Sequence, residues 1–232
     1  MSEPWRRALQ YAFANHRMIS FINRDQQVNW LRLDLVLEQI PSVQINAELD
    51  KMLAAFNRLM KYKSVKEVTL GYFRMLEVRQ HGELSEARIH MLLPTLKSYF
   101  QGRYYLKHDT WLKLWRKAMN RESDHRVLVE VGVISDKSDR ERIIHKMKRC
   151  MQQLQLDPEN AKSCDSTSGR RWIGYGKLLK QYMKLPKTTA DGDLSFYDTD
   201  DAIANSAFEI MLEWYPGIRH DAIRSESSSL IL

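Results

Sequence analysis

The stretch Glu86-Ala-Arg-Ile-His-Met-Leu-Leu-Pro94, preceded by Arg74-Met-Leu-Glu77, decides how this chain folds. Both segments read as β-strands, and the short polar segment between them reads as a turn. Strand side chains alternate between two faces, so Arg88 and His90 share one face. A hairpin connection would place the Glu77 carboxylate near that face. The sequence therefore predicts an antiparallel pair with one acidic and two basic side chains on the same side.

Two further segments alternate in the same way, Val28–Leu37 and Val127–Val133. Strands that alternate apolar and polar residues indicate an antiparallel sheet with one covered face. Helical periodicity and capping residues predict helices between and around the strands. The expected helices are Trp5–Ile22, one that Asn46 caps and that carries Leu49 to Met60, Thr110–Asn120 capped by Asp109, one opened by the capping box Ser138-Asp-Arg-Glu141, Tyr175–Met183, and Asp200–Trp214. This order predicts an α+β fold, an antiparallel sheet with helices packed on it.

The composition is that of an ordinary globular protein, with 232 residues, 44% hydrophobic and 28% charged. No run of 18 apolar residues predicts a membrane span, and the first residues lack the apolar core of a signal peptide. Cys150 and Cys164 show no CxxC spacing, which argues against a zinc site built on cysteine. We therefore expect a cytoplasmic protein without a membrane partner.

The chain is basic, with a net charge of +7 and a pI of about 9.3. A basic balance favours polyanionic partners, because a cation near a phosphate releases counterions. Between Lys162 and Lys187 there are seven Lys or Arg residues and a single acidic one, interleaved with Trp172, Tyr175 and Tyr182. Cations with aromatic rings between them suit nucleic-acid strands. A solvated helix face with core aromatics explains the same pattern equally well.

Six segments occur in the order found in one known family. They are Trp30-Leu-Arg-Leu-Asp-Leu-Val36, Ala55-Phe-Asn-Arg-Leu59, Gly71-Tyr-Phe-Arg-Met-Leu-Glu77, Arg88-Ile-His-Met-Leu-Leu93, Tyr105-Leu-Lys-His-Asp-Thr-Trp-Leu-Lys-Leu-Trp-Arg-Lys-Ala118 and Gly169-Arg-Arg-Trp-Ile-Gly-Tyr-Gly176. Together they resemble the plasmid rolling-circle replication initiators, the Rep branch of the HUH endonucleases. The resemblance implies an HUH/RRM-like sheet. It also implies a nucleic-acid-processing domain over 26–185, a helical segment over 1–25, and a C-terminal helix with a flexible tail over 186–232.

In that family two histidines, separated by one residue, hold a divalent metal that polarises the scissile phosphate, and an acidic residue assists. The resemblance assigns the second histidine to His90 and the acidic position to Glu77, with Mg²⁺ or Mn²⁺ as the metal if the protein is active. Arg88 stands at the first histidine. A guanidinium stays cationic and cannot ligate a metal, although it can clamp phosphate oxygens. The first-strand motif, a Thr-Leu-Thr pattern in the family, is also altered, with Asp34 in its polar row.

The family attacks the phosphate with a tyrosine on the helix after the fourth strand. The matching segment here, Glu141-Arg-Ile-Ile-His-Lys-Met-Lys148, places His145 at that position. His145 is therefore the catalytic candidate on this helix, and an ordinary surface histidine is the alternative. Tyr175 and Tyr182 are the tyrosines of the following segment that remain as substitutes.

Three functions follow from these features. The first is a replication protein that keeps DNA binding while nicking is lost or weakened. Its expected partner is single-stranded or hairpin origin DNA, and a homodimer is compatible with this function. The second is an active nickase with an unusual site. The third is a basic protein-interaction domain, in which His90 and Glu77 form a buried ion pair and Arg88 pairs with Glu77 or Glu86. For a binding role the expected phosphate contacts are Arg74, Arg88, Lys146, Lys148, Arg170 and Arg171.

Overall fold

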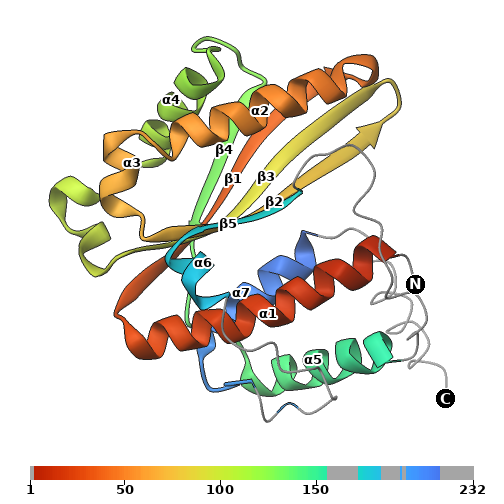
Figure 1. Ribbon diagram of the computed structural model, residues 1–232, viewed down its shortest axis with the longest axis vertical. Helices are drawn as coiled ribbons and strands as arrows, with labels where there is room; N and C mark the ends of the chain where they lie inside the picture. The colour runs from red at the N-terminus through yellow and green to blue at the C-terminus, as the bar shows by residue number, and fades with distance from the viewer. Residues whose placement is uncertain (1–2, 156–171, 184–193, 195–196, 215–232) are drawn as a thin grey trace. The chain divides into compact units, whose positions relative to one another are not determined.

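A computed structural model describes residues 3–155, 172–183, 194 and 197–214 of the chain. Its centre is a five-stranded sheet with the order β4-β1-β3-β2-β5, in which every neighbouring pair is antiparallel (Figure 1). The strands are β1 Val28–Pro41, β2 Gly71–His81, β3 Leu84–Leu96, β4 Val127–Val133 and β5 Ile173–Lys177. The predicted α+β class with an antiparallel sheet is confirmed.

The helices connect and follow these strands. They are α1 Glu3–Asp25, α2 Ile45–Leu59, α3 Lys63–Val68, α4 His108–Met119, α5 Arg140–Gln155, α6 Leu178–Tyr182 and α7 Ala202–Glu213, with the 3₁₀ turns η1 Ser42–Gln44, η2 Lys97–Phe100 and η3 Gly102–Tyr104. None of the helices that the structure describes has the length and apolar character needed to cross a membrane.

The described residues form two compact units. The sheet unit contains all five strands with α2, α3, α4 and α6, and the helical unit contains α1, α5 and α7. Each unit therefore combines segments from distant parts of the chain. This grouping differs from the chain-order division into 1–25, 26–185 and 186–232.

In the sheet unit, one face of β1 and β3 packs against α2 and α4 (Figure 1). Every second side chain of β1 projects to this face, because strand side chains alternate between two faces. These residues are Leu31, Leu33, Leu35 and Leu37. Trp111 and Trp115 of α4 lie buried in the same cluster, which makes these tryptophans core residues. The opposite face of the same strands carries the polar side chains described below.

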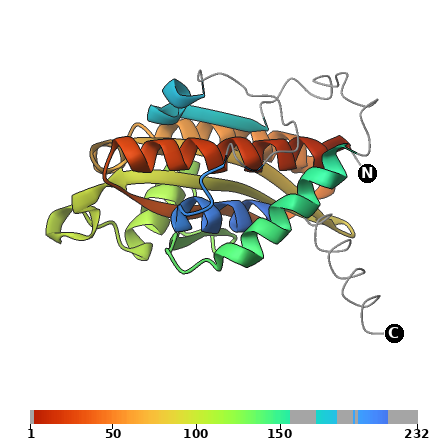
Figure 2. The same cartoon turned by 90° about the horizontal axis from the view of Figure 1, so that it is seen from below.

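In the helical unit, α1 packs along α7 (Figures 1 and 2). His16 of α1 lies fully buried, and its Nε2 is 2.9 Å from Oδ1 of Asn205 on α7. Asn205 in turn donates from Nδ2 to the carbonyl of Thr199. Asp201 caps α7 by accepting from the N–H of Ala204 at 2.8 Å. The contact of His16 with Asn205 thus joins the two helices, and the contacts of Thr199 and Asp201 hold the start of α7.

Side chains of α4 occupy the outer edge of β4, which is an edge strand of the sheet. Arg116 donates from Nε to the carbonyl of Val127 at 3.2 Å, and His108 donates from Nε2 to the carbonyl of Val129 at 2.9 Å. Unpaired carbonyls on an edge strand invite pairing with another chain. The two side chains thus satisfy acceptors that the sheet leaves open.

Some boundaries differ from the sequence-based expectation. Asn46 and Asp109 lie inside the first turns of α2 and α4 rather than at their caps, because each helix begins one or more residues earlier. Pro94 lies within β3 instead of ending it. Its carbonyl accepts from the N–H of Leu70, so its nitrogen faces the β2 side, where the regular ladder stops at Leu92.

The largest difference concerns the expected helix over Tyr175–Met183. Its first part is the strand β5, and only Leu178–Tyr182 is helical. Two glycines allow β5 to lie close against β2, since a Cβ on Gly176 would lie 2.1 Å from the Tyr72 ring. This close pairing is a tertiary constraint that local propensity does not reveal.

Candidate functional site

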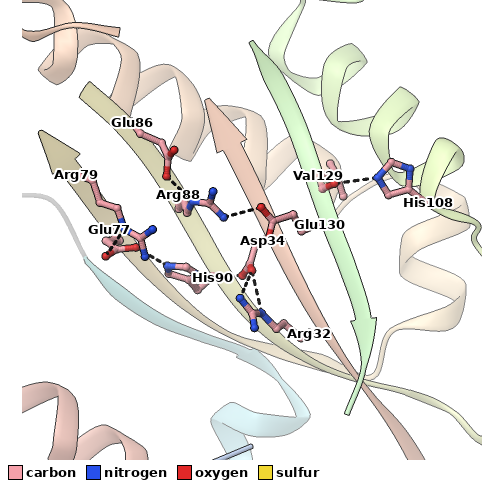
Figure 3. Close-up of polar contacts among 10 residues, drawn as sticks. All are labelled: Arg32, Asp34, Glu77, Arg79, Glu86, Arg88, His90, His108, Val129 and Glu130. Carbon is pink, nitrogen blue, oxygen red and sulfur yellow. Dashed lines mark hydrogen bonds and ion pairs between the residues drawn. The ribbon is translucent and has the colours of Figure 1, made fainter. Parts of the chain in front are cut away.

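A cluster of charged side chains lies on the face of the sheet opposite to α2 and α4 (Figure 3). The register places Asp34 of β1 opposite His90 of β3, and Glu77 of β2 opposite Arg88. Directly paired residues project to the same face, so all four share it. The predicted proximity of Glu77 to the Arg88 and His90 face is confirmed.

His90 is held by a carboxylate at each ring nitrogen. Its Nδ1 lies 2.8 Å from Oδ1 of Asp34, and its Nε2 lies 2.8 Å from Oε2 of Glu77. The side chain is only 1% exposed. A neutral imidazole has one N–H and one lone pair, so only the imidazolium donates to both carboxylates. Burial disfavours this charged form, but the hydrogen bonds to Asp34 and Glu77 outweigh burial and raise the pKa of His90.

Each of the two carboxylates also pairs with an arginine. Arg32 donates from Nε to Asp34 and Arg79 donates from Nε to Glu77, both at 2.9 Å. Burial alone would raise the pKa of both carboxyls. The hydrogen bonds from His90 and from the arginines reverse this effect and lower the pKa of Asp34 and of Glu77. The result is a continuous chain of alternating charge across β1, β3 and β2.

Arg88 forms a second group on the same face. Its Nε donates to Glu86 and one terminal nitrogen donates to Glu130 of β4 at 2.8 Å (Figure 3). Burial opposes the charge, but both carboxylates favour it and raise the pKa of the guanidinium. Arg88 thus pairs with Glu86, one of the two partners expected under the protein-interaction alternative.

The whole cluster is balanced in charge. Four members are cationic, counting the imidazolium, and four are anionic: Arg32, Arg79, Arg88 and His90 against Asp34, Glu77, Glu86 and Glu130. A phosphate that approached Arg88 would have to displace Glu86 or Glu130. The cluster therefore has the electrostatics of a closed ion network rather than of an anion-binding patch.

The residues present do not fit the divalent metal that the resemblance implies. Two donors remain, Nε2 of His90 and the carboxylate of Glu77, and a proton joins them. The third donor is replaced by the guanidinium of Arg88, which has no lone pair. Among the described residues, no group of three or more His, Cys, Asp or Glu side chains has the geometry of a metal site.

The other residues expected from the sequence lie elsewhere. Arg74 pairs with Met91 and so projects to the opposite face of the sheet from Arg88, with its guanidinium 5.3 Å from the Phe56 ring centroid. His145, Lys146 and Lys148 lie on α5 of the helical unit. His145 and Lys148 are exposed, and Lys146 contacts Glu209 of α7 at 3.1 Å. Arg170 and Arg171 lie outside the described residues.

The two substitute tyrosines belong to the sheet unit. Tyr175 of β5 pairs with Phe73 of β2, which in turn pairs with Leu92 of β3. Tyr175 therefore projects to the same face as His90, and its ring packs on Phe73 with centroids 5.0 Å apart. Tyr182 lies on α6, which follows β5.

Comparison with known proteins now adds to this geometry. The replication protein family matches this chain over residues 3–222. This chain belongs to the replication protein family. A Protein rep of Bacillus amyloliquefaciens is 30% identical over 93% of the chain and 72% of its own length. A Protein rep of a Bacillus species is 29% identical over 82% and 71%, and a Replication protein of Staphylococcus aureus is 27% identical over 83% and 89%. No solved structure matches. The recognition of a plasmid replication initiator family from ordered motifs is thus confirmed.

Sequence reasoning about this replication protein missed the roles of Asp34 and Glu130, whereas it named Glu86 as a possible partner of Arg88. Asp34 was recognised in the polar row of the first strand but without its partner, because register across β1 and β3 is not encoded locally. Glu130 differs little from a surface glutamate in sequence. The signal that could have found Asp34 is a charged residue at a strand position flanked by leucines.

Proposed function

We propose that this replication protein binds plasmid DNA and has lost strand nicking at the sheet site. It would act at the origin, as an origin-binding factor or a copy-number regulator. The family implies a DNA partner, and we propose that this DNA is the single-stranded or hairpin form of the origin. The proposed loss of nicking rests on the position of His90 between Asp34 and Glu77.

Loss by random decay would leave buried polar groups without partners, which costs about 1–3 kcal/mol each. The charged cluster around His90 shows no such unpartnered groups. No side-chain atom of Asp34, Glu77, Arg88 or His90 is among the buried polar atoms without a partner in the described residues. The changes at Asp34 and Arg88 therefore support a site rebuilt for stability, with the sheet kept as a scaffold.

The residue at the position of the nucleophile also supports the loss of nicking. Helix α5 contains no tyrosine, and the residue that the family alignment places there is the exposed His145. A phosphohistidine would need a neutral imidazole close to a polarised phosphate. Arg142, Lys146 and Arg149 surround His145 in sequence, which suits an ordinary position on a basic helix.

The test combines a binding assay with a denaturing gel on the same samples. Labelled hairpin and single-stranded oligonucleotides from a plasmid origin are mixed with the full chain, with Mg²⁺ or Mn²⁺ added. We expect affinity that falls with salt and no band of protein covalently linked to DNA. Absence of binding at low salt would refute the DNA-binding role, and a covalent band would refute the loss of nicking.

A specific observation keeps the active nickase as a second candidate. Tyr175 lies on the His90 face, two strands away from β3. Should a covalent band form, Tyr175 is the first residue to examine. Tyr175→Phe would then abolish the band, whereas His145→Gln would leave it unchanged.

A further inference from the structure

The segment between β3 and α4 carries two exposed aromatic rings in contact with each other. Phe100 is 44% exposed and Tyr105 is 46% exposed, and their ring centroids are 5.9 Å apart. Single exposed apolar side chains are normal on a protein surface. An exposed pair of rings held side by side requires a reason.

The backbone is shaped to bring these rings together. Gly102 has φ +57°, a conformation that favours glycine, and it reverses the chain between Phe100 and Tyr105. The 3₁₀ turn η2 ends at Phe100, and Gly102 itself begins η3. The two rings therefore become neighbours although they are five residues apart.

A buried tyrosine supports both rings from beneath. Tyr99 is 1% exposed and lies edge-on to Phe100 at 5.0 Å and to Tyr105 at 5.7 Å. Its hydroxyl donates to the carbonyl of Leu106 at 3.1 Å and accepts from Nε1 of Trp111 at 3.3 Å. The ring pair is thus tied to the core through α4, so its geometry exists before any ligand binds.

The surroundings are basic. No Asp or Glu occurs between Glu86 and Asp109, whereas Lys97 and Lys107 are exposed. Lys97 and Phe100 are three residues apart in a 3₁₀ turn, which places them on the same side. Asp109, the first carboxylate after the segment, contacts His108 at 3.2 Å. In contrast to the balanced cluster around His90, this segment carries exposed lysines and no carboxylate before Asp109.

We infer that Phe100 and Tyr105, flanked by Lys97 and Lys107, form a platform on which unpaired bases of single-stranded DNA stack. This inference rests on the proposed DNA-binding function and names its contact surface. Base faces stack on aromatic rings whatever the sequence, and the lysines attract the backbone. Duplex DNA keeps its bases stacked inside the helix, so the platform discriminates in favour of single strands.

The experiment measures binding of the full chain to a labelled single-stranded oligonucleotide and to the duplex of the same sequence, by fluorescence anisotropy. Phe100→Leu and Tyr105→Leu remove a ring and keep an apolar side chain. Each is expected to weaken single-strand binding on the order of tenfold, with little effect on duplex binding. Phe100→Tyr and Tyr105→Phe keep the ring and are expected to bind like the unaltered protein, which separates stacking from misfolding.

Val43→Ala is the matched control, because Val43 is 94% exposed and lies on η1, in a different segment of the sheet unit. It should leave both affinities unchanged. A second readout is photo-crosslinking of an oligonucleotide that carries 5-iodouracil, with the crosslink expected at Phe100 or Tyr105.

The outcomes distinguish a failure of the platform from a failure of DNA binding as a whole. If the unaltered protein binds no DNA at all, the proposed function fails and the platform with it. If it binds single strands and the leucine variants bind equally well, the platform alone is refuted. The platform is also refuted if the leucine variants change only the sedimentation of the protein, because the rings would then contact a second copy.

Discussion

Oδ1 of Asp34 lies 2.8 Å from Nδ1 of His90, across the ladder that joins β1 and β3. This contact orients the imidazole so that its other nitrogen points at Glu77. A carboxylate behind a histidine is also the arrangement that orients metal-binding histidines. Here the ring that is held in this way donates an N–H hydrogen bond to Glu77 instead of a lone pair to a metal.

Asp34→Asn tests how strongly this network stabilises the sheet unit. The variant leaves His90 and Arg32 without their shared buried carboxylate, and breaking a buried charge pair costs about 3–5 kcal/mol. We expect a loss of this order in the free energy of unfolding, measured with urea. Glu130→Gln is the control, since Glu130 is 54% exposed and its pair with Arg88 should contribute less than about 1 kcal/mol. Equal losses in the two variants would contradict a buried, cooperative network.

Arg88→His should create metal affinity that the unaltered protein lacks. The substitution adds a third donor beside His90 and Glu77, and Asp34 already orients the His90 ring. Mn²⁺ binding, followed by the loss of the free-ion electron paramagnetic resonance signal, should appear in this variant and release a proton. Arg88→Gln removes the cation without adding a donor and should not bind. Mn²⁺ binding by the unaltered protein would show that the metal readily displaces the proton between His90 and Glu77.

His16 should make the helical unit less stable in acid. Burial lowers the pKa of His16 below its ordinary 6.5, against the opposing effects of the Asn205 hydrogen bond and of Asp201 and Asp198. The unfolded chain therefore takes up a proton near pH 6.5, whereas the folded chain does so only at lower pH. This term lowers stability as the pH falls below about 6.5 and is absent at higher pH.

The measurement compares the free energy of unfolding near pH 7.5 and near pH 5 for the unaltered protein and for His16→Gln. The glutamine can still hydrogen-bond to Asn205, but it does not titrate. The loss between the two pH values should be smaller in the variant. An identical loss in both proteins would assign the acid sensitivity to other groups.

Gly176→Ala should destabilise the pairing of β5 with β2. A Cβ at this position would lie 2.1 Å from Cε1 of Tyr72, whose ring packs against Phe56. Forcing an extra group into such a packed site typically costs about 1–3 kcal/mol. Gly132→Ala is the matched control on β4, because nothing lies within 4 Å of its Cβ position. The two variants should differ clearly in urea midpoint, and similar midpoints would mean that the Tyr72 ring moves aside easily.

Much of this architecture follows from period-2 alternation in the sequence. The alternation identified β1, β4 and the β2–β3 hairpin, and it placed Arg88 and His90 on one face. It did not identify β5, where glycines leave too few side chains to show a pattern. It also did not identify the partners of His90, since the contact between Asp34 and His90 joins residues 56 positions apart.

Family likeness assigned roles to residues that the local pattern had brought together, and the structure limits what that likeness implies. The hairpin pattern located His90 and Glu77 correctly with respect to each other. The phosphate contacts expected for a binding role include both Arg74 and Arg88, yet the register places these two side chains on opposite faces of the sheet. Residues that are close in a motif can diverge in space because alternate strand positions face apart.

The side chains of Arg116 and His108 on the rim of β4 affect how the protein behaves at high concentration. A strand from a second molecule that approached this rim would find the carbonyls of Val127 and Val129 already occupied. Sheet-to-sheet growth between copies, the usual route from an open rim to insoluble aggregates, is therefore obstructed along this part of β4. At high protein concentration this part of the rim therefore offers a second copy no free carbonyl at Val127 or Val129.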